Sequence, residues 1–452
     1  MSTTVDGIRS CFEGVIPGVM ATCDADGTPN VSSLSHVQYV DAEHIALSYQ
    51  FFNKTRQNIL ANPRATLQVV DPQTAAQYRL SLQYLRTETS GPLFESMKAK
   101  LAGIASHVGM AGVFRLLGSD VFRVLAVERV PGHSLPTPEP RRNLLAALRH
   151  SSERIARCCD LDRLLTEILA CLEEHFDITH AMVLIHDAPR ARLYTVASRG
   201  YEESGVGSEI PLGEGVIGVA ARERTPIRIG HATLEYAYSR AIRDHARDGG
   251  LAAALATEIP LPGLPEPRSQ MAVPIVAGPT LVGVLYVESP QELRFTYDDE
   301  DALVALCAQL GMASNILQSA AETADAQPAP APAAGPARPQ NDATEPQGDA
   351  ILVRHYPEND SVFLGDDYLI KGVAGAIFIT LLRDYVDKNR SEFTNRELRL
   401  DARIRLPDVS DNLEARLILL SRRLVERGAC VRIEKTGRGR FRLRVDRPLA
   451  LA

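Results

Sequence analysis

The spacing of apolar residues changes twice along this chain, and each spacing predicts a different kind of structure. From about residue 8 to residue 132, short apolar runs such as 19–22, 31–40 and 45–48 alternate with turn residues. Short strands separated in this way favour an antiparallel barrel or sandwich. We therefore predict a mostly β-structured domain over residues 8–132.

The second stretch, residues 141–319, begins and ends with a helical repeat of apolar residues. Leu161 and Leu165 belong to the repeat of the first helix, and Leu303 and Leu310 belong to that of the last helix. Apolar runs with the length of strands lie between the two helices. The pattern predicts a mixed domain with helices at both of its ends.

The third stretch, residues 350–447, predicts strands at both ends and helices between them. A long helix is expected over residues 370–388, and residues 394–397 form a capping box that starts a shorter helix. A third helix carries a stripe of leucines that we expect to be buried: Leu413, Leu417, Leu420 and Leu424. The whole chain is thus expected to be a multidomain α+β protein.

Residues 320–349 separate the second and third stretches and have the composition of a disordered linker. Positions 321–349 hold nine Ala and six Pro, and no Leu, Ile, Val, Phe or Tyr. Such a segment cannot bury enough apolar surface to offset the entropy that it loses on ordering. We expect a semi-stiff spacer here rather than a rigid link.

The composition is that of a folded protein that is neither secreted nor membrane-spanning. The chain has 452 residues, of which 45% are hydrophobic and 23% charged. No run approaches the roughly 18 apolar residues that a spanning helix needs, and no signal peptide is recognised at the start. The seven cysteines form no C-x-x-C pair, so we assign no metal ligands. We expect a cytoplasmic protein.

The net charge of −7 hides a strong asymmetry along the chain. From Ile351 onward there are 20 Lys and Arg against 15 Asp and Glu, so the preceding residues carry −12. Between Leu413 and Arg447 the count is 11 basic against 4 acidic residues. Such a local concentration of positive charge indicates a polyanionic partner, although a solvated basic surface would have the same composition.

Residues 45–64 suggest a phosphate site in the first domain. An apolar strand ends at Ser48, the cations Lys54 and Arg56 flank Thr55, and a helix follows. Clustered cations near a helix start are suited to binding phosphate. The stretch resembles the split barrel of the pyridoxamine 5'-phosphate oxidase-like family, which binds flavin mononucleotide (FMN).

That resemblance implies FMN as the cofactor, and it carries over a set of cofactor-binding residues: Ser33, Ser48, Asn53, Lys54, Thr55, Arg56 and Asn58. Tyr49 or Phe51 would supply any stacking on the flavin ring, because the chain has no Trp. A barrel that binds haem or a deazaflavin, or an empty barrel, stays open. We assign no catalytic residues, since His36 and Arg79 are isolated in the sequence.

The second domain resembles a GAF domain through residues 210–218, 272–275, 283–287 and 295–300. The glycine string within 210–218 also matches G-x-G-x-x-G, but no long buried strand precedes it, so a dinucleotide site is not favoured. An F-x-x-x-D-E pattern, the residues Phe295, Asp299 and Glu300, is typical of cyclic-nucleotide-binding GAF domains and equally of an acidic helix start.

No lysine lies between Lys100 and Lys371, so the Asn-Lys half of the cyclic-nucleotide signature is missing. Residues 236–255 are expected to cover a pocket for a small-molecule ligand. The alternatives are a haem site, for which no single histidine stands out, and a GAF domain that has no ligand and serves for dimerisation.

The third domain looks like the winged helix of response-regulator output domains, in which a small sheet precedes the helices. The resemblance implies DNA binding by arginines on the third helix and on the final strands: Arg416, Arg422, Arg423, Arg427, Arg438, Arg440, Arg442 and Arg444. Alternation along a strand directs Arg440, Arg442 and Arg444 to one side. A winged-helix module used for protein contacts is the alternative.

Taken together, these patterns predict a cytoplasmic one-component transcription regulator that forms a homodimer. It would sense redox state or a small molecule through the FMN-type barrel and the GAF domain, and bind DNA through the winged helix. The main alternative is a flavin-dependent oxidoreductase whose GAF and winged-helix domains are regulatory. An interaction protein with an empty barrel is a third hypothesis.

Overall fold

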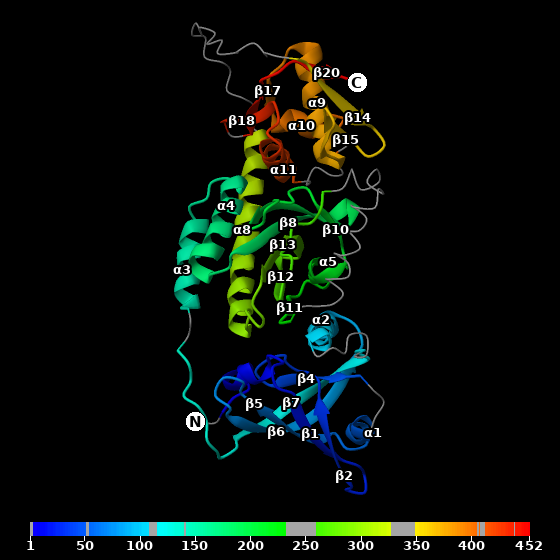
Figure 1. The fold of residues 1–452 in the computed structure, drawn as a ribbon, viewed down its shortest axis with the longest axis vertical. Helices are drawn as coiled ribbons and strands as arrows, with labels where there is room; N and C mark the ends of the chain where they lie inside the picture. The colour runs from blue at the N-terminus through cyan, green and yellow to red at the C-terminus, as the bar shows by residue number, and fades with distance from the viewer. Residues whose placement is uncertain are drawn as a thin grey trace.

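The computed structural model describes residues 3–452 except 51–53, 108–114, 140–141, 232–258, 327–348, 405, 407–411 and 438. The described chain forms three parts stacked in a column (Figure 1). The N-terminal part runs to residue 139, the central part covers 142–326, and the C-terminal part starts at residue 349. Contacts between side chains join each part to the next.

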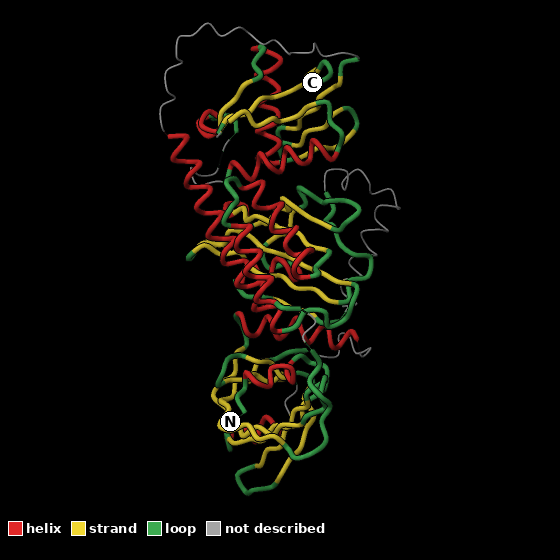
Figure 2. The backbone as a smooth tube through the Cα atoms, turned by 90° about the vertical axis from the view of Figure 1, so that its left-hand side faces the viewer, coloured by secondary structure: helices red, strands yellow, loops and turns green. Residues whose placement is uncertain are grey.

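The N-terminal part is built on an antiparallel sheet that curls on itself around a buried core (Figure 2). Its described strands have the order β2-β1-β5-β6-β7-β4-β3. They are β1 (Gly18–Cys23), β2 (Pro29–Leu34), β3 (Val37–Tyr39), β4 (His44–Tyr49), β5 (Arg64–Val70), β6 (Gln77–Glu88) and β7 (Gly118–Arg129). The helical elements are η1 (Asp6–Phe12), α1 (Lys54–Ala61) and α2 (Pro92–His107). Phe12, Met20 and Phe122 are fully buried inside the sheet, as a curled sheet requires.

The single strand expected over residues 31–40 is two strands in the structure. β2 ends at Leu34 and β3 starts at Val37, and the two lie at opposite edges of the sheet. The chain crosses between the edges through Ser35 and His36. His36 is itself buried, and no Gly or Pro stands between Leu34 and Val37 to mark the break in the sequence.

The central part has helices on both faces of a six-stranded antiparallel sheet, counted over its described residues. The strand order is β10-β9-β8-β13-β12-β11. The strands are β8 (His180–Asp187), β9 (Arg192–Arg199), β10 (Glu209–Pro211), β11 (Ile227–Ile229), β12 (Ser269–Ala277) and β13 (Thr280–Ser289), and η2 (Ala188–Arg190) joins β8 to β9. Helices α3 (Leu144–Ile155), α4 (Leu161–Phe176) and α8 (Tyr297–Ala326) lie on one face, and α5 (Gly215–Glu223) lies on the other (Figure 1).

Helix α8 is long and apolar enough to cross a membrane by length and composition over Tyr297–Ala320, although 39% of that stretch is buried inside the protein. Leu303, Leu306 and Leu310 are fully buried, and α8 packs on β12. The apolar composition is therefore explained by its place in the core. The helix continues to Ala326, into the stretch that the sequence analysis assigns to the linker.

The C-terminal part places its helices between two small sheets. In the described residues, one sheet has the strand order β16-β15-β14-β20 and the other β17-β19-β18. The strands are β14 (Ile351–Tyr356), β15 (Ser361–Leu364), β16 (Asp367–Ile370), β17 (Glu392–Thr394), β18 (Val431–Gly437), β19 (Arg440–Val445) and β20 (Leu449–Leu451). The helices are α9 (Gly372–Lys388), α10 (Asn395–Leu400) and α11 (Leu413–Glu426).

The helix starts of the C-terminal part are set by local capping. The Thr394 side chain accepts a hydrogen bond from the Glu397 amide, and the Glu397 side chain accepts one from the Thr394 amide, which is the expected capping box. Asn412 caps α11 by accepting from the Ala415 amide. These short-range bonds explain why the helix order could be predicted from sequence.

Helix α11 is buried on two faces, whereas the sequence predicts a single leucine stripe. Leu413, Leu420 and Leu424 are buried as expected, but Ile418 and Leu419, off that stripe, are equally buried. Helix α11 contacts α9, β16 and β18 of the C-terminal part, and it also contacts α4 and β9 of the central part. The C-terminal part is therefore docked on the central part.

A buried charge cluster joins the N-terminal and central parts. The guanidinium of Arg228 on β11 lies 2.5 Å from a Glu13 carboxylate oxygen and 2.8 Å from one of Glu300. Its Cζ also lies 4.3 Å from the ring centroid of Tyr297. The Tyr297 hydroxyl accepts a hydrogen bond from Nζ of Lys100 at 3.1 Å. The contacts of Glu13 with Arg228 and of Lys100 with Tyr297 thus cross from the N-terminal part to the central part.

Burial shifts several pKa values at this junction. Burial and the charge of Arg228 lower the pKa of Lys100 to about 8. Burial raises the pKa of the Tyr297 hydroxyl well above its ordinary value. Burial, with a contribution from Lys100, lowers the pKa of His36 to about 3. In the folded protein, the imidazole of His36 is therefore uncharged at neutral pH.

We expect Glu13→Gln to destabilise the junction between the N-terminal and central parts by about 3 kcal/mol, because it leaves the buried Arg228 with a missing charge partner. The measurement is the midpoint of the first unfolding transition in urea. The matched control is Glu43→Gln, whose partner Arg123 is about half exposed, and for which less than about 0.5 kcal/mol is expected. Equal effects of the two changes would contradict the role of the cluster.

We expect His36 to make the N-terminal part less stable as the pH falls below about 6.5. The unfolded imidazole binds a proton below that pH, whereas the folded one stays neutral down to about 3. The loss of unfolding free energy between about pH 7 and pH 5 is about 2 kcal/mol. His36→Leu should remove this part of the pH dependence in urea unfolding, and His133→Leu, at an exposed position, should not. An unchanged pH profile in His36→Leu would disprove the assignment.

Candidate functional site

The curled sheet of the N-terminal part contains a cavity of about 110 Å³ close to the start of α1. Hydroxyl groups and one ion pair supply its polar lining, while Met20 and Phe122 belong to its apolar lining. The polar side chains come from β2, β4, α1 and β7 and from the residues that directly follow β2 and β4: Ser32, Ser33, Ser35, Ser48, Gln50, Thr55, Arg56 and Asp120. The cavity therefore gathers residues that lie far apart in the sequence.

Thr55 is the hydroxyl held most firmly at this cavity. Its Oγ1 donates to Ser32 Oγ at 2.9 Å and accepts from Asn30 Nδ2 at 2.9 Å. Because Thr55 is the second residue of α1, its position follows from the helix start that the sequence predicts. The hydrogen bonds link α1 to β2, so the hydroxyls on these two elements form one set.

Arg56 carries the positive charge of the cavity, and Asp120 is its ion-pair partner. The guanidinium carbon of Arg56 lies 4.7 Å from the ring centroid of Tyr49 and 5.6 Å from that of Tyr84. Asp120 also accepts a hydrogen bond from Thr87 at 2.5 Å. Burial raises the pKa of the Asp120 carboxyl, against the opposing effects of Thr87 and Arg56.

The remaining predicted cofactor residues are placed differently. Ser33 and Ser48 line the cavity with Thr55 and Arg56. Lys54 is half exposed and pairs with Asp24 at 2.9 Å, away from the cavity lining. Asn58 is buried and donates to Thr22 Oγ1 at 3.1 Å, which ties α1 to β1. Asn53 and Phe51 lie outside the described residues.

Asp120 is a residue of this cavity that was not predicted from the sequence. Asp120 lies opposite Leu47 in the pairing of β4 with β7, and that pairing brings it near Arg56. No local motif marks it, because it is distant from the Lys54–Arg56 cluster in sequence. Only the pairing of the strands could have identified it.

The side chains at the cavity fit the phosphate of an FMN-type cofactor. Threonine and serine hydroxyls donate to phosphate oxygens, and a guanidinium has five N–H donors. The ion pair with Asp120 holds the Arg56 guanidinium at the cavity, where charge-assisted hydrogen bonds to phosphate would form. FMN bound here would supply reversible hydride or electron transfer, while these residues would bind its phosphate.

Three of the four arginines predicted on the third helix of the C-terminal part face protein in this structure. Arg416 and Arg423 are each 4% exposed, and Arg423 donates to the Leu369 carbonyl at 3.0 Å. Arg422 is partly buried and pairs with Asp162 of the central part at 2.7 Å. Arg427 is exposed. The sequence could not show this, because an arginine off a leucine stripe looks solvent-facing until a second domain covers it.

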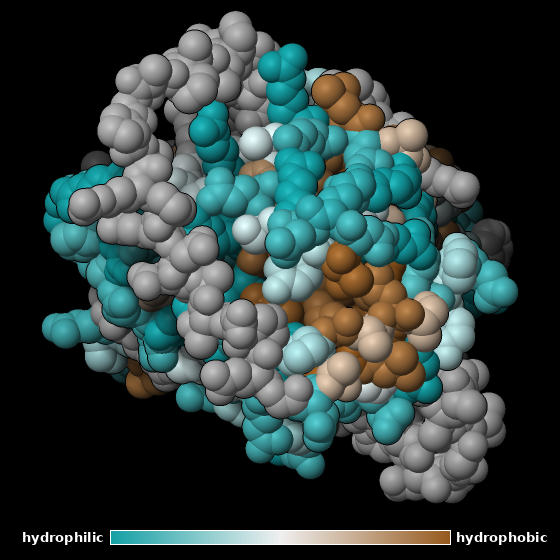
Figure 3. Space-filling view, turned by 90° about the horizontal axis from the view of Figure 1, so that it is seen from above, coloured by the Kyte–Doolittle hydropathy of each residue, from teal (hydrophilic) through white to brown (hydrophobic). Residues whose placement is uncertain are grey.

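The arginines of the terminal strands remain at the surface. Burial alternates along β19, so Arg440, Arg442 and Arg444 are exposed on one face while the residues between them are buried. Arg442 pairs with Glu392 at 2.6 Å, and Arg444 lies 3.2 Å from Asp446. Arg438 lies outside the described residues. Seen from above, the surface around the C-terminal part is largely hydrophilic beside one apolar patch (Figure 3).

The glycine string of the central part makes a turn into a helix rather than a nucleotide loop. Gly213 and Gly215 have φ of +87° and +59°, a region that favours glycine. A Cβ on Gly218 would lie 2.4 Å from the Pro211 carbonyl oxygen. The preceding strand β10 is a short antiparallel edge strand, so a dinucleotide-binding βαβ unit is not formed.

The F-x-x-x-D-E residues have structural contacts. Asp299 accepts hydrogen bonds from the amide and the hydroxyl of Thr296 at the start of α8. Glu300 pairs with Arg228, and Phe295 is buried in the core. These contacts agree with the helix-start alternative. Residues 236–255, expected to cover the pocket, lie outside the described residues.

Comparison with known families identifies two of the three parts. Residues 5–127 match the family described as pyridoxamine 5'-phosphate oxidase, and residues 160–313 match the GAF domain. The chain therefore contains a pyridoxamine-phosphate-oxidase-like domain followed by a GAF domain, which confirms both resemblances. Domains of these kinds are typical of soluble proteins and support a sensory or regulatory role.

Solved structures resemble separate portions of the chain. A GAF domain from an Acinetobacter phosphoenolpyruvate-protein phosphotransferase is 22% identical, with coverage of 39% of this chain and 94% of its own (TM-score 0.31). An FMN-binding protein from Syntrophomonas wolfei is 15% identical, with 28% and 86% coverage (TM-score 0.24). A free methionine-R-sulfoxide reductase from Neisseria meningitidis is 21% identical, with 39% and 91% coverage (TM-score 0.30). No curated protein matches the chain.

Proposed function

We propose that this protein is a one-component transcription regulator whose N-terminal and central parts sense a signal and whose C-terminal part binds DNA. The observation that carries the proposal is the row of exposed arginines on β19, beside α10 and α11. A sheet, three helices and a terminal strand pair in this order support a winged helix, with β18 and β19 as its wing. The sensor-type domains on the same chain supply the input.

FMN is the cofactor that we propose for the N-terminal part, with haem or a deazaflavin as the alternatives. The support is the match to the pyridoxamine-phosphate-oxidase family and the donor set of Thr55, Arg56 and the serines at the cavity. The redox state of a flavin, or a ligand of the GAF domain, would be the signal. We propose that the protein is cytoplasmic and acts as a homodimer, so that two C-terminal parts can meet paired DNA half-sites.

The surface pairs of the wing do not oppose this function. Arg442 and Arg444 pair with acidic neighbours while about half of each arginine side chain stays exposed. Exposed ion pairs contribute about 1 kcal/mol or less. Phosphates of DNA can therefore replace Glu392 and Asp446 as partners, and the release of counterions from DNA would favour that exchange.

We expect Thr55→Val and Arg56→Met each to weaken FMN binding by about tenfold or more, because each removes a donor to the charged phosphate. The measurement is quenching of flavin fluorescence during titration of the purified protein. Arg64→Met, at an exposed position of β5, is the matched control. Unchanged FMN affinity in both cavity variants would show that this cavity does not bind the phosphate, and absence of any flavin binding would exclude FMN.

We expect Arg442→Met/Arg444→Met to weaken binding to duplex DNA and to reduce the slope of log affinity against log salt by about 2, one for each lost phosphate contact. Fluorescence anisotropy with a labelled random-sequence duplex at several salt concentrations measures both quantities. Arg123→Met, which removes a half-exposed arginine of the N-terminal part, should leave the slope unchanged. Salt-independent binding, or an unchanged slope in the double variant, would contradict the proposed wing.

A further inference from the structure

Basic side chains at α11 meet carboxylates of the central part. Arg416 donates to Asp187 at 2.7 Å, both side chains are buried, and its guanidinium carbon lies 4.1 Å from the ring centroid of Tyr194. One helical turn and a half further on, Arg422 reaches Asp162 at 2.7 Å and also donates to the Val196 carbonyl. Both arginines are among those predicted to contact DNA.

Further polar contacts extend this junction on both sides of α11. Lys435 of β18 lies 3.6 Å from Asp160, and Lys371, the cap of α9, lies 3.8 Å from Glu209. In each pair the cation belongs to the C-terminal part and the carboxylate to the central part. The central part therefore presents negative charge to the basic face of its neighbour, as a DNA backbone would.

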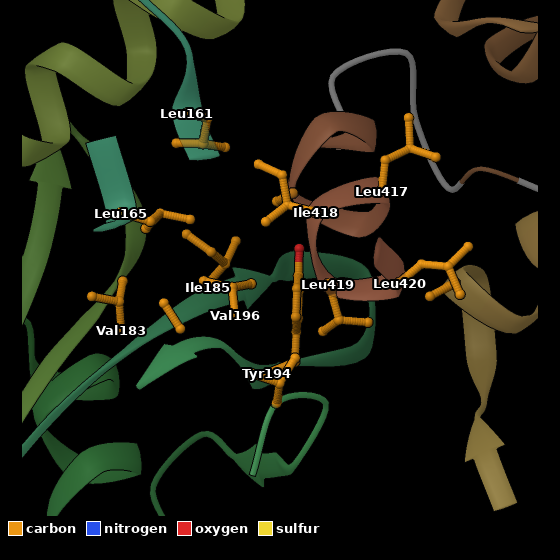
Figure 4. Close-up of a cluster of buried hydrophobic side chains, with 14 of the residues drawn as sticks. Leu161, Leu165, Val183, Ile185, Tyr194, Val196, Leu417, Ile418, Leu419 and Leu420 are labelled. Atoms are coloured by element: carbon orange, nitrogen blue, oxygen red, sulfur yellow. The ribbon is translucent and has the colours of Figure 1, made fainter. Parts of the chain in front are cut away.

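Apolar side chains complete the junction between these charges. Leu417, Ile418 and Leu419 of α11 lie in one buried cluster with side chains of α4, β8 and β9 (Figure 4). Among those partners are Leu165 and Val196, both fully buried. The central part thus covers the second apolar face of α11, where Ile418 and Leu419 are buried.

The junction is incompletely filled. A cavity of about 1070 Å³ lies along it, lined by residues of both parts that include Asp162, Leu417 and Arg440. Val425, on α11 beside this cavity, is 70% exposed. Water therefore reaches part of the seam, and several of its ion pairs are partly solvated. Contacts of that kind are individually weak, so the buried Arg416–Asp187 pair and the apolar cluster contribute more to this junction than the partly solvated pairs do.

A winged helix binds the major groove with the second helix of its helix-turn-helix, which in this part is α11. A helix covered by α4 and β9 cannot also enter a groove about 12 Å wide. We infer that the docked arrangement is a closed state in which Asp162 and Asp187 form ion pairs with arginines that would otherwise contact DNA. This inference rests on the proposed DNA-binding function and adds its regulation.

The position of the acidic residues connects this closed state to the sensor. Asp162 lies in the first turn of α4, and Asp187 ends β8, both in the framework of the GAF domain. A change in that framework would move the carboxylates relative to α11. Opening would increase the fraction of protein molecules that are able to bind DNA. The apparent affinity for DNA rises in proportion to that fraction.

The test compares Asp162→Asn with the unchanged full-length protein. Removing the carboxylate should weaken docking, increase the radius of gyration in small-angle X-ray scattering, and tighten binding to a labelled random-sequence duplex at low salt by about fivefold. Asp187→Asn, which removes the buried carboxylate that pairs with the buried Arg416, should produce a larger change of the same sign. The matched control, Glu153→Gln on α3, removes a carboxylate that pairs only with Arg149 among the described contacts, and should change neither quantity.

The possible outcomes separate the inference from the proposed function. A larger radius of gyration together with tighter DNA binding in the Asp162 and Asp187 variants supports the closed state. A larger radius of gyration with unchanged DNA affinity overturns the inference and leaves the proposed DNA binding intact. If neither variant changes the scattering, these carboxylates do not hold the junction and the inference is wrong. If the variants open but no form binds DNA at low salt, the proposed function itself fails.

Discussion

A charge that is removed from water must be paired, and this constraint sets both junctions of the molecule. Arg228 is buried between the N-terminal and central parts with Glu13 and Glu300. Arg416 is buried between the central and C-terminal parts with Asp187. Removing one partner of such a pair costs far more than losing a surface pair. The relative positions of the three parts therefore depend on a few guanidinium–carboxylate contacts.

The two junctions differ in how tightly they are sealed. Two residues beside Arg228, Tyr297 and Lys100, are buried. Their burial shifts their pKa values strongly. Between the central and C-terminal parts, a large cavity lies beside Arg422, and its ion pair with Asp162 is partly exposed. The first junction is therefore more fully closed to solvent than the second. This difference is what the proposed closed state of the C-terminal part depends on.

Local patterns were reliable wherever a short-range interaction decides the structure. The capping box at Thr394, the glycine turn into α5 and the alternation along β19 follow from bonds or sterics within a few residues. In the candidate FMN site, Thr55 and Arg56 belong to such a local segment. Both were predicted from the sequence, and both line the cavity. Asp120 was not, because only the pairing of β4 with β7 places it there.

The sequence by itself determined the barrel-like and GAF-type domains, the order of elements in the C-terminal part and the basic character of that part, since periodicity, caps and composition are local properties. Only the tertiary structure decided which arginines face solvent. Arg416 and Arg442 look alike in sequence, yet one is buried against Asp187 and the other lies on an exposed strand face. The reason is that burial on the second face of α11 comes from another domain, and contacts between distant segments leave no periodic signal in either segment.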